Sequence, residues 1–291
     1  MWALLHSSFV RSQLMRVVLA PAVLAALAVM SSRLLSQGAP RLASAIAGLA
    51  VPAAFLAGYF AVYRDFTFPP ATVLSWVPWF IVALILAIPL ANLGGASRVA
   101  ALAILVAASG TAVLLWPILG RESLSAAWVA WALAAVVWSA LWILSGAPRV
   151  GGVPFAAIAL VVSAGLAVVA PLSGSILLGE LAATLAVALV ANLILNPFSG
   201  SPRLSGAGRA TTTFVLGALV LDLRFYAGVG TGVVGAFVAS VALGLGAQFV
   251  IRRYRREGSW AVLAPAFAAL IPVAAAVAIA FKASSMGGGG Y

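Results

Sequence analysis

The sequence predicts an all-α polytopic transmembrane helix bundle, with nine to ten spanning helices joined by short loops. Of its 291 residues, 65% are hydrophobic and only 7% are charged, whereas a soluble domain carries about 25% charged residues. Because so little charge cannot cover a surface that faces water, lipid must be the main solvent. In lipid every backbone N–H and C=O needs a partner inside the protein, which leaves helices and closed barrels. The apolar runs are long and do not alternate at every second residue, so helices are favoured.

Charged residues and Gly/Pro clusters divide the chain into ten apolar runs, each close to the roughly 20 residues that cross a hydrocarbon core of about 30 Å. The predicted spans are 15–32, 42–63, 74–93, 99–119, 124–145, 153–171, 174–196, 210–225, 228–251 and 259–281. Most connections are a few residues long, so we expect consecutive helices to be antiparallel neighbours. We expect a single integral membrane domain over 1–291, in which the glycine-rich segment 282–291 is a flexible tail.

The net charge of +11 fits contact with lipid headgroups, because the arginines are scattered between the apolar runs in ones and twos. This distribution argues against nucleic-acid binding. Ten spans place both termini on the same side of the membrane. The basic cluster at 252–256 lies on the opposite side, so the positive-inside rule predicts both termini outside the cytoplasm, in the cell (inner) membrane.

Candidate chemistry is limited by the residue types that the sequence lacks. There is no cysteine, and the single histidine, His6, lies in the N-terminal segment. Thiol nucleophiles, thiolate metal sites and a His-based catalytic dyad are therefore excluded. We predict no catalytic residue and no metal ligand set, and the sequence requires no cofactor. The acids Asp65 and Glu122 adjoin arginines, which is typical of ion pairs at headgroup level.

Four positions form a candidate intramembrane polar site. Glu180 has no basic neighbour in sequence, and Thr184 lies four residues later on the same helix face. An ionisable group at membrane depth is costly, so Glu180 is expected to face a partner or a cavity, unless it sits at the helix N-terminus, where the helix dipole favours an acid. Asp222 and Arg224, two residues apart, face different directions and would need separate partners. The alternative for this pair is snorkelling at the helix end.

The fifth span carries Trp128, Trp131, Trp138 and Trp142 on one face, at about 0°, 300°, 280° and 320° around the helix. Membrane tryptophans usually mark the interfaces, but Trp131 and Trp138 fall near the middle of this span. The stripe is a candidate face for a flat apolar ligand or a neighbouring subunit. Ordinary packing against lipid or the core is the alternative.

Small residues recur at every fourth position of the ninth span, and this row predicts a helix-packing seam. Such a row lets two helix backbones approach closely, within the chain or between two copies of it. The seam consists of Gly228, Gly232, Ala236, Ser240 and Gly244.

The length, the roughly ten spans and the string Leu177-Leu178-Gly179-Glu180 are similar to drug/metabolite-type transporters. Proteins of that family are built from two five-helix halves, with a Leu-Gly-Glu string late in each half. Here the string begins the seventh span, and a corresponding copy in the first half is absent. The resemblance implies a small-molecule transporter and covers four residues of this chain.

Three functions remain open from the sequence. The first is a non-catalytic subunit or scaffold of a membrane complex, which contacts lipids, apolar cofactors, other membrane subunits or a second copy of itself. Such a protein should have a dry core. The second is a transporter of small molecules or lipids, which should have a polar cavity near mid-membrane. The third is a membrane enzyme acting on lipids, which should bring acids together, for example Asp65, Glu122, Glu180 and Asp222.

Overall fold

The computed structural model describes residues 15–63, 68–70, 72–93, 95–119, 124–146, 152–195, 204, 206–253 and 260–287. Within these ranges the chain forms ten α-helices and no strand. A π-helical turn, Met15–Leu19, precedes the first helix, and a short 3-10 turn, Leu74–Trp76, precedes the third. The helices are α3 Ala20–Leu35, α4 Pro40–Val62, α5 Val77–Leu93, α6 Ala96–Leu119, α7 Leu124–Gly146, α8 Gly152–Leu172, α9 Ile176–Leu195, α10 Gly206–Phe225, α11 Thr231–Arg253 and α12 Trp260–Gly287.

The predicted fold class is confirmed, since each of the ten predicted spans corresponds to one of these helices. Three ends differ. Helix α10 begins at Gly206 instead of 210, and α11 begins at Thr231 instead of 228, because Gly228 adopts a positive φ of 68° in the turn before it. Helix α12 continues to Gly287 through part of the segment expected to be a flexible tail, because that segment contains no helix breaker before its glycine run.

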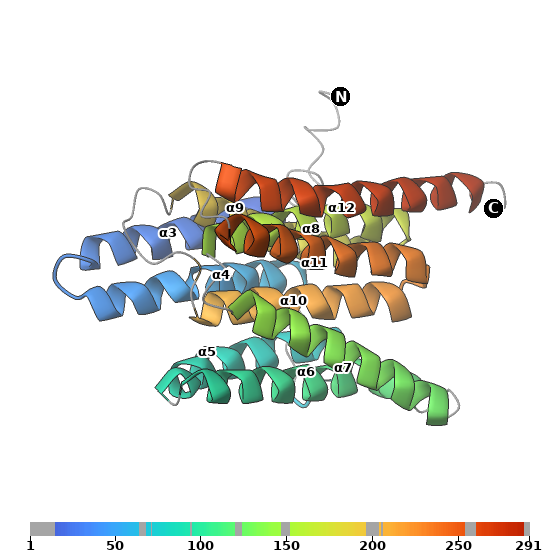
Figure 1. Cartoon of the computed structure of the whole chain (residues 1–291), viewed down its shortest axis with the longest axis horizontal. Coiled ribbons are helices and arrows are strands. Elements are labelled where there is room, and N and C mark those ends of the chain that lie inside the picture. The colour runs from blue at the N-terminus through green and yellow to red at the C-terminus, as the bar shows by residue number, and fades with distance from the viewer. Residues whose placement is uncertain are drawn as a thin grey trace.

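Most consecutive helices lie side by side along the long axis of the molecule, whereas α7 and α8 lie on different sides of the bundle (Figure 1). Helices α5, α6 and α7 form one side of the bundle, and α12 lies along the opposite edge, against α8 and α11. Nine helical segments of the described chain are long and apolar enough to span a membrane. Together with the apolar surface this makes the chain a multi-pass integral membrane protein.

Helix α10 is the centre of the bundle, although it is the one helix not apolar enough to count as a span. It contacts α4, α5, α6, α7, α8, α9 and α11, and most of its residues are buried. Its charged and threonine side chains make this helix less apolar than the others. They also explain its central position, because a helix that carries them is costly against lipid. The more apolar helices surround it and expose large hydrophobic side chains such as Leu86, Leu133 and Ile271.

Most buried hydroxyls are satisfied within their own helices, as they must be where water is excluded. Thr111 donates to the carbonyl of Ala107, Ser163 donates to that of Ala159, and Thr212 donates to that of Gly208, at 2.7–2.8 Å. The core itself is dominated by hydrocarbon side chains. The polar groups that lack such partners therefore stand out.

Candidate functional site

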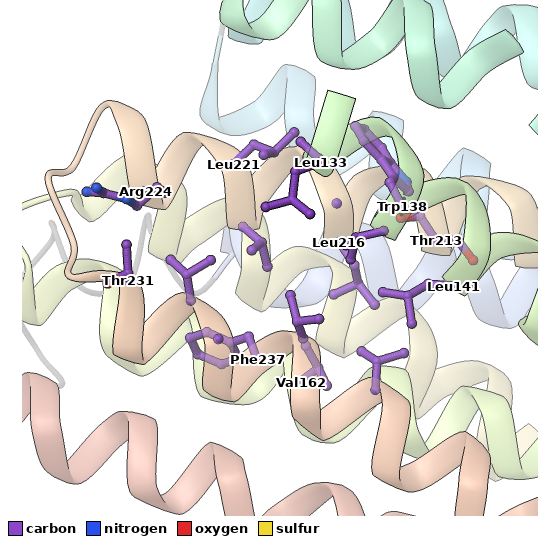
Figure 2. Close-up of a pocket in the computed structure, with 18 of the residues that line it drawn as sticks. Leu133, Trp138, Leu141, Val162, Thr213, Leu216, Leu221, Arg224, Thr231 and Phe237 are labelled. Atoms are coloured by element: carbon purple, nitrogen blue, oxygen red, sulfur yellow. Dashed lines mark hydrogen bonds between the residues drawn. The ribbon is translucent and has the colours of Figure 1, made fainter. Parts of the chain in front are cut away.

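A groove of about 350 Å³ runs along helix α10, between α7 and α11. It lies where α7, α10 and α11 contact one another only sparsely. Figure 2 shows side chains from these helices converging on it, together with Val162 of α8. The groove is open on one side, where large apolar side chains such as Leu133 are exposed. In a membrane this opening faces the lipid.

Nearly all of the lining is hydrocarbon. Helix α10 contributes the floor with Leu216, Gly217, Val220 and Leu221, and α7, α8 and α11 contribute the walls. The walls include Leu133, Val137, Leu141, Phe155, Val162, Val234, Gly235, Phe237, Val238 and Val241. A lining of this kind suits an apolar molecule or an apolar chain.

The few polar side chains of the groove lie at its two ends. Arg224 and Thr231 lie together at one end, and Thr213 and Trp138 lie near the other (Figure 2). The Trp138 indole N–H donates to the Thr213 carbonyl at 3.2 Å, so this end has no free indole donor. The groove is therefore cationic at the Arg224 end and apolar elsewhere.

Two of the four predicted tryptophans are core residues. Trp138 and Trp142 are only 4% exposed, and the Trp138 ring lies 5.2 Å from that of Phe214, centroid to centroid. Trp138 fills a notch left by Gly217, because a Cβ added to that glycine would overlap its indole ring. One edge of Trp138 still forms part of the groove wall. Its main contacts are structural.

The other two tryptophans lie at the start of the same face. Trp131 donates to the carbonyl of Ala108 on α6 at 3.1 Å. Trp128 is 56% exposed and meets the Trp131 ring edge to face, with centroids 5.5 Å apart. Along the stripe, the tryptophans are therefore exposed at the N-terminal end of α7 and buried in the core at its C-terminal end.

Glu180 and Thr184 lie where α9 meets the N-terminal helices. The Thr184 hydroxyl donates to the Glu180 backbone carbonyl at 2.9 Å, so it does not hydrogen-bond the Glu180 carboxylate. Thr184 is buried in a notch of α4, where a Cβ added to Gly58 would overlap it. The half-buried Glu180 carboxylate interacts electrostatically with Arg16, from the π-helical turn that contacts α9. The positive charge that acts on Glu180 thus comes from another helical segment.

Asp222 and Arg224 have separate surroundings, about 200° apart around α10. Arg224 lines the groove and donates to the carbonyl of Val229 at 3.2 Å. Asp222 is on the far side of α10 and is 1% exposed. Neither of its carboxylate oxygens has a hydrogen-bond partner among the described residues. A buried carboxyl group without partners is costly, which makes Asp222 the most unusual polar group of the structure.

The predicted seam of α11 is shorter than the sequence pattern. Gly228 lies in the turn before the helix, and Gly232 has open space where a Cβ would be. Ser240 donates to the Ala269 carbonyl of α12 at 2.5 Å, and a Cβ on Gly244 would lie 2.8 Å from Ile158 of α8. Ala236 is half-buried between these regions. Close approach is therefore limited to the second half of the row.

Comparison of this chain with protein-family models, with curated proteins and with solved structures finds no match. The groove has hydrocarbon side chains along its length and a guanidinium at one end. Among the described residues, no three His, Asp or Glu side chains lie together as a metal site would require. The acids Asp65, Glu122 and Glu257 and most of the basic cluster at 252–256 lie outside the described residues.

Two residues of this region were not singled out by the sequence. Phe214 stacks on Phe80 of α5 with centroids 5.0 Å apart, and it also contacts Trp138. Arg209 donates to the Ser145 carbonyl of α7 at 2.6 Å and lies 5.8 Å from the ring centroid of Phe155. A phenylalanine in an apolar run and an arginine at a helix start are both common, so neither carries a signal of its own.

Proposed function

We propose that this protein is a non-catalytic integral membrane protein that binds an apolar or amphiphilic ligand within the bilayer, as a subunit or scaffold of a membrane complex. The groove beside α10 carries this proposal. Its volume of about 350 Å³ falls in the range of roughly 300–1,000 Å³ that is typical of ligand pockets. Its opening toward lipid would admit a molecule that is dissolved in the membrane.

The packing of the groove supports a binding role as well. Its floor is the most enclosed helix of the bundle, and Trp138 is fixed there by a hydrogen bond and by ring contacts. A site on rigid elements keeps its shape when the ligand leaves, so little free energy is spent on ordering it. The predominance of hydrocarbon side chains in the core also supports a role as a membrane subunit.

Filling the groove tests this proposal. Gly235 lines the groove and has no atom within 4 Å of the position of an added Cβ, and the same open space surrounds Gly246 on the same helix. Gly235→Leu is therefore expected to occupy ligand space without a clash. We expect mass spectrometry of the protein purified in mild detergent to detect a co-purifying apolar compound, and Gly235→Leu to reduce its amount at least several-fold.

Gly246→Leu is the matched control, because Gly246 lies on the exposed surface of α11 and outside the groove lining. It should leave the ligand in place. Equal ligand content in the wild type and in Gly235→Leu would show that the groove is not the binding site. The same preparation identifies protein partners, which distinguishes a subunit from a chain that acts alone.

The proposed location is the cell membrane, with both termini on the non-cytoplasmic side. The chain has no native cysteine, so single replacements report on each end of the bundle. Ser285→Cys near the C-terminal end of α12 should react with a membrane-impermeant maleimide in intact cells. Gln37→Cys, in the turn between α3 and α4, should react only after lysis; both side chains are exposed at their helix ends. The reverse pattern would invert the orientation.

A transporter is the second candidate, and Asp222 is the observation that favours it. Buried carboxyl groups inside membrane proteins commonly mark ion or proton pathways. Asp222 lies on the central helix, away from the groove, and has no hydrogen-bond partner among the residues that the structure describes. Proton flux into proteoliposomes that depends on this residue would support transport, and Asp222→Asn should then abolish the flux.

A further inference from the structure

We infer that the groove binds one acyl chain of an anionic phospholipid, with the lipid phosphate held by Arg224. This inference rests on the proposed function and names the ligand class of the same groove. It depends on three observations: the length of the groove, the depth of its polar end, and the charge that is left unpaired there.

The length of the groove matches one leaflet. Its lining extends from Thr213 to Phe225 on α10 and from Thr231 to Val241 on α11. At a rise of 1.5 Å per residue these stretches are about 15–18 Å long. The hydrocarbon core of a bilayer is about 30 Å thick, so the groove extends through roughly half of it. An acyl chain of a neighbouring lipid has the same reach.

The polar end of the groove lies at the end of the bundle. Arg224 is followed by the last residue of α10, and Thr231 is the first residue of α11. The turn between these helices lies at the same end of the molecule as the C-terminal end of α12 (Figure 1). A lipid whose chain fills the groove therefore has its phosphate close to Arg224, at the level of the headgroups.

The charge of Arg224 is not neutralised by the protein. Its guanidinium has five N–H donors, of which one is used by the Val229 carbonyl. No carboxylate in the described part of the chain forms a salt bridge with it, and Asp222 points away on the other side of α10. The ring of Phe225 lies 5.8 Å from the guanidinium carbon. The remaining donors fit a phosphate group, which arginine binds through two parallel hydrogen bonds.

The opening of the groove selects a lipid of the bilayer over a water-soluble anion. A free phosphate would find one arginine and a hydrocarbon wall, and so would lack most of its partners. An anionic amphiphile satisfies both parts of the site at once. Among such amphiphiles we choose the phospholipid, because it is already present at the open side of the groove, with its phosphate at the depth of Arg224.

The test measures the binding of two lipids that differ in headgroup charge. Phosphatidylglycerol and phosphatidylcholine with the same acyl chains are titrated into the delipidated full-length protein and followed by native mass spectrometry. We expect the wild type to prefer phosphatidylglycerol about tenfold, the magnitude of one charge-assisted contact. Arg224→Gln should remove the preference, and Arg224→Lys should retain part of it. Arg253→Gln, at the opposite end of α11, should leave it unchanged.

The possible failures can be distinguished. If Arg224→Gln keeps the wild-type preference, the phosphate is not at Arg224 and the inference is overturned. If both lipids bind equally in the wild type but Gly235→Leu still blocks them, the proposed function stands while the inference fails. If Gly235→Leu blocks neither lipid, the groove is not a lipid site and both fail. Tighter binding of oleate than of phosphatidylglycerol would assign the site to a free fatty acid and also overturn the inference.

Discussion

Replacing Gly217 with leucine is expected to lower the stability of the folded protein by about 3 kcal/mol, the upper part of the range for overpacked cores. A Cβ at this position overlaps the indole ring of Trp138. The ring has little freedom to move away, because its N–H is bonded to Thr213 and its face is packed on Phe214. Thermal unfolding in detergent, followed by tryptophan fluorescence, measures the effect as a lower Tm.

Gly235→Leu provides the comparison, since Gly235 borders the same groove and has open space around it. Its Tm should stay close to that of the wild type. Replacing Trp138 with alanine should remove the overlap between its indole ring and a leucine at position 217. The double variant Gly217→Leu with Trp138→Ala is therefore expected to be more stable than the sum of the two single effects predicts. A Gly217→Leu protein with an unchanged Tm would show that α7 and α10 are not packed in this way.

Replacing Asp222 with valine is expected to raise the stability of the folded protein by about 1–3 kcal/mol, the cost of leaving a buried polar group without a partner. Valine is similar in size and has no polar atom, so it suits a position that is 1% exposed. Stabilising substitutions are uncommon at random positions. A large gain at this position would indicate that the carboxyl group is kept for function and not for folding. The measurement is again the Tm in detergent.

Asp222→Asn is the matched control, because it removes the charge and keeps two polar atoms in the same place. Its gain in stability should be smaller than that of valine. If Asp222→Val instead lowers the Tm, the carboxyl group has a stabilising partner, and the case for Asp222 as an ion or proton site is lost. Proton flux measured on the same Asp222→Asn protein then separates transport from a purely structural role.

The helices could be predicted from the sequence because the membrane imposes a length on them. A run such as 74–93 must be about 20 residues long and apolar to cross the hydrocarbon core, and its ends coincide with those of Leu74–Trp76 and α5. Ends that depend on local backbone conformation were less predictable. Because Gly228 has a positive φ, α11 begins three residues later than predicted. The pattern of apolar residues does not predict that turn.

The candidate site was predictable only in part. Spacing alone put the four tryptophans on one face of α7, but the direction of that face depends on a glycine of α10 far away in sequence. Spacing also separated Asp222 from Arg224, and the bundle then buried one and left the other at the end of a groove. The sequence left open whether Glu180 faces a partner, a cavity or the end of its own helix, and its electrostatic interaction with Arg16 depends on how the first helical turn packs on α9.

The sequence by itself determined that this chain is embedded in lipid, and roughly where each helix of its described part begins and ends. These properties follow from solvation, which acts on each segment separately. Only the tertiary structure decided which helix is central. Helix α10 is not apolar enough to count as a span, and it lies in the middle because its charges and threonines are less costly against protein than against lipid. The groove beside it lies where α7, α10 and α11 contact one another only sparsely, and this arrangement of three helices cannot be predicted from the sequence of any one of them.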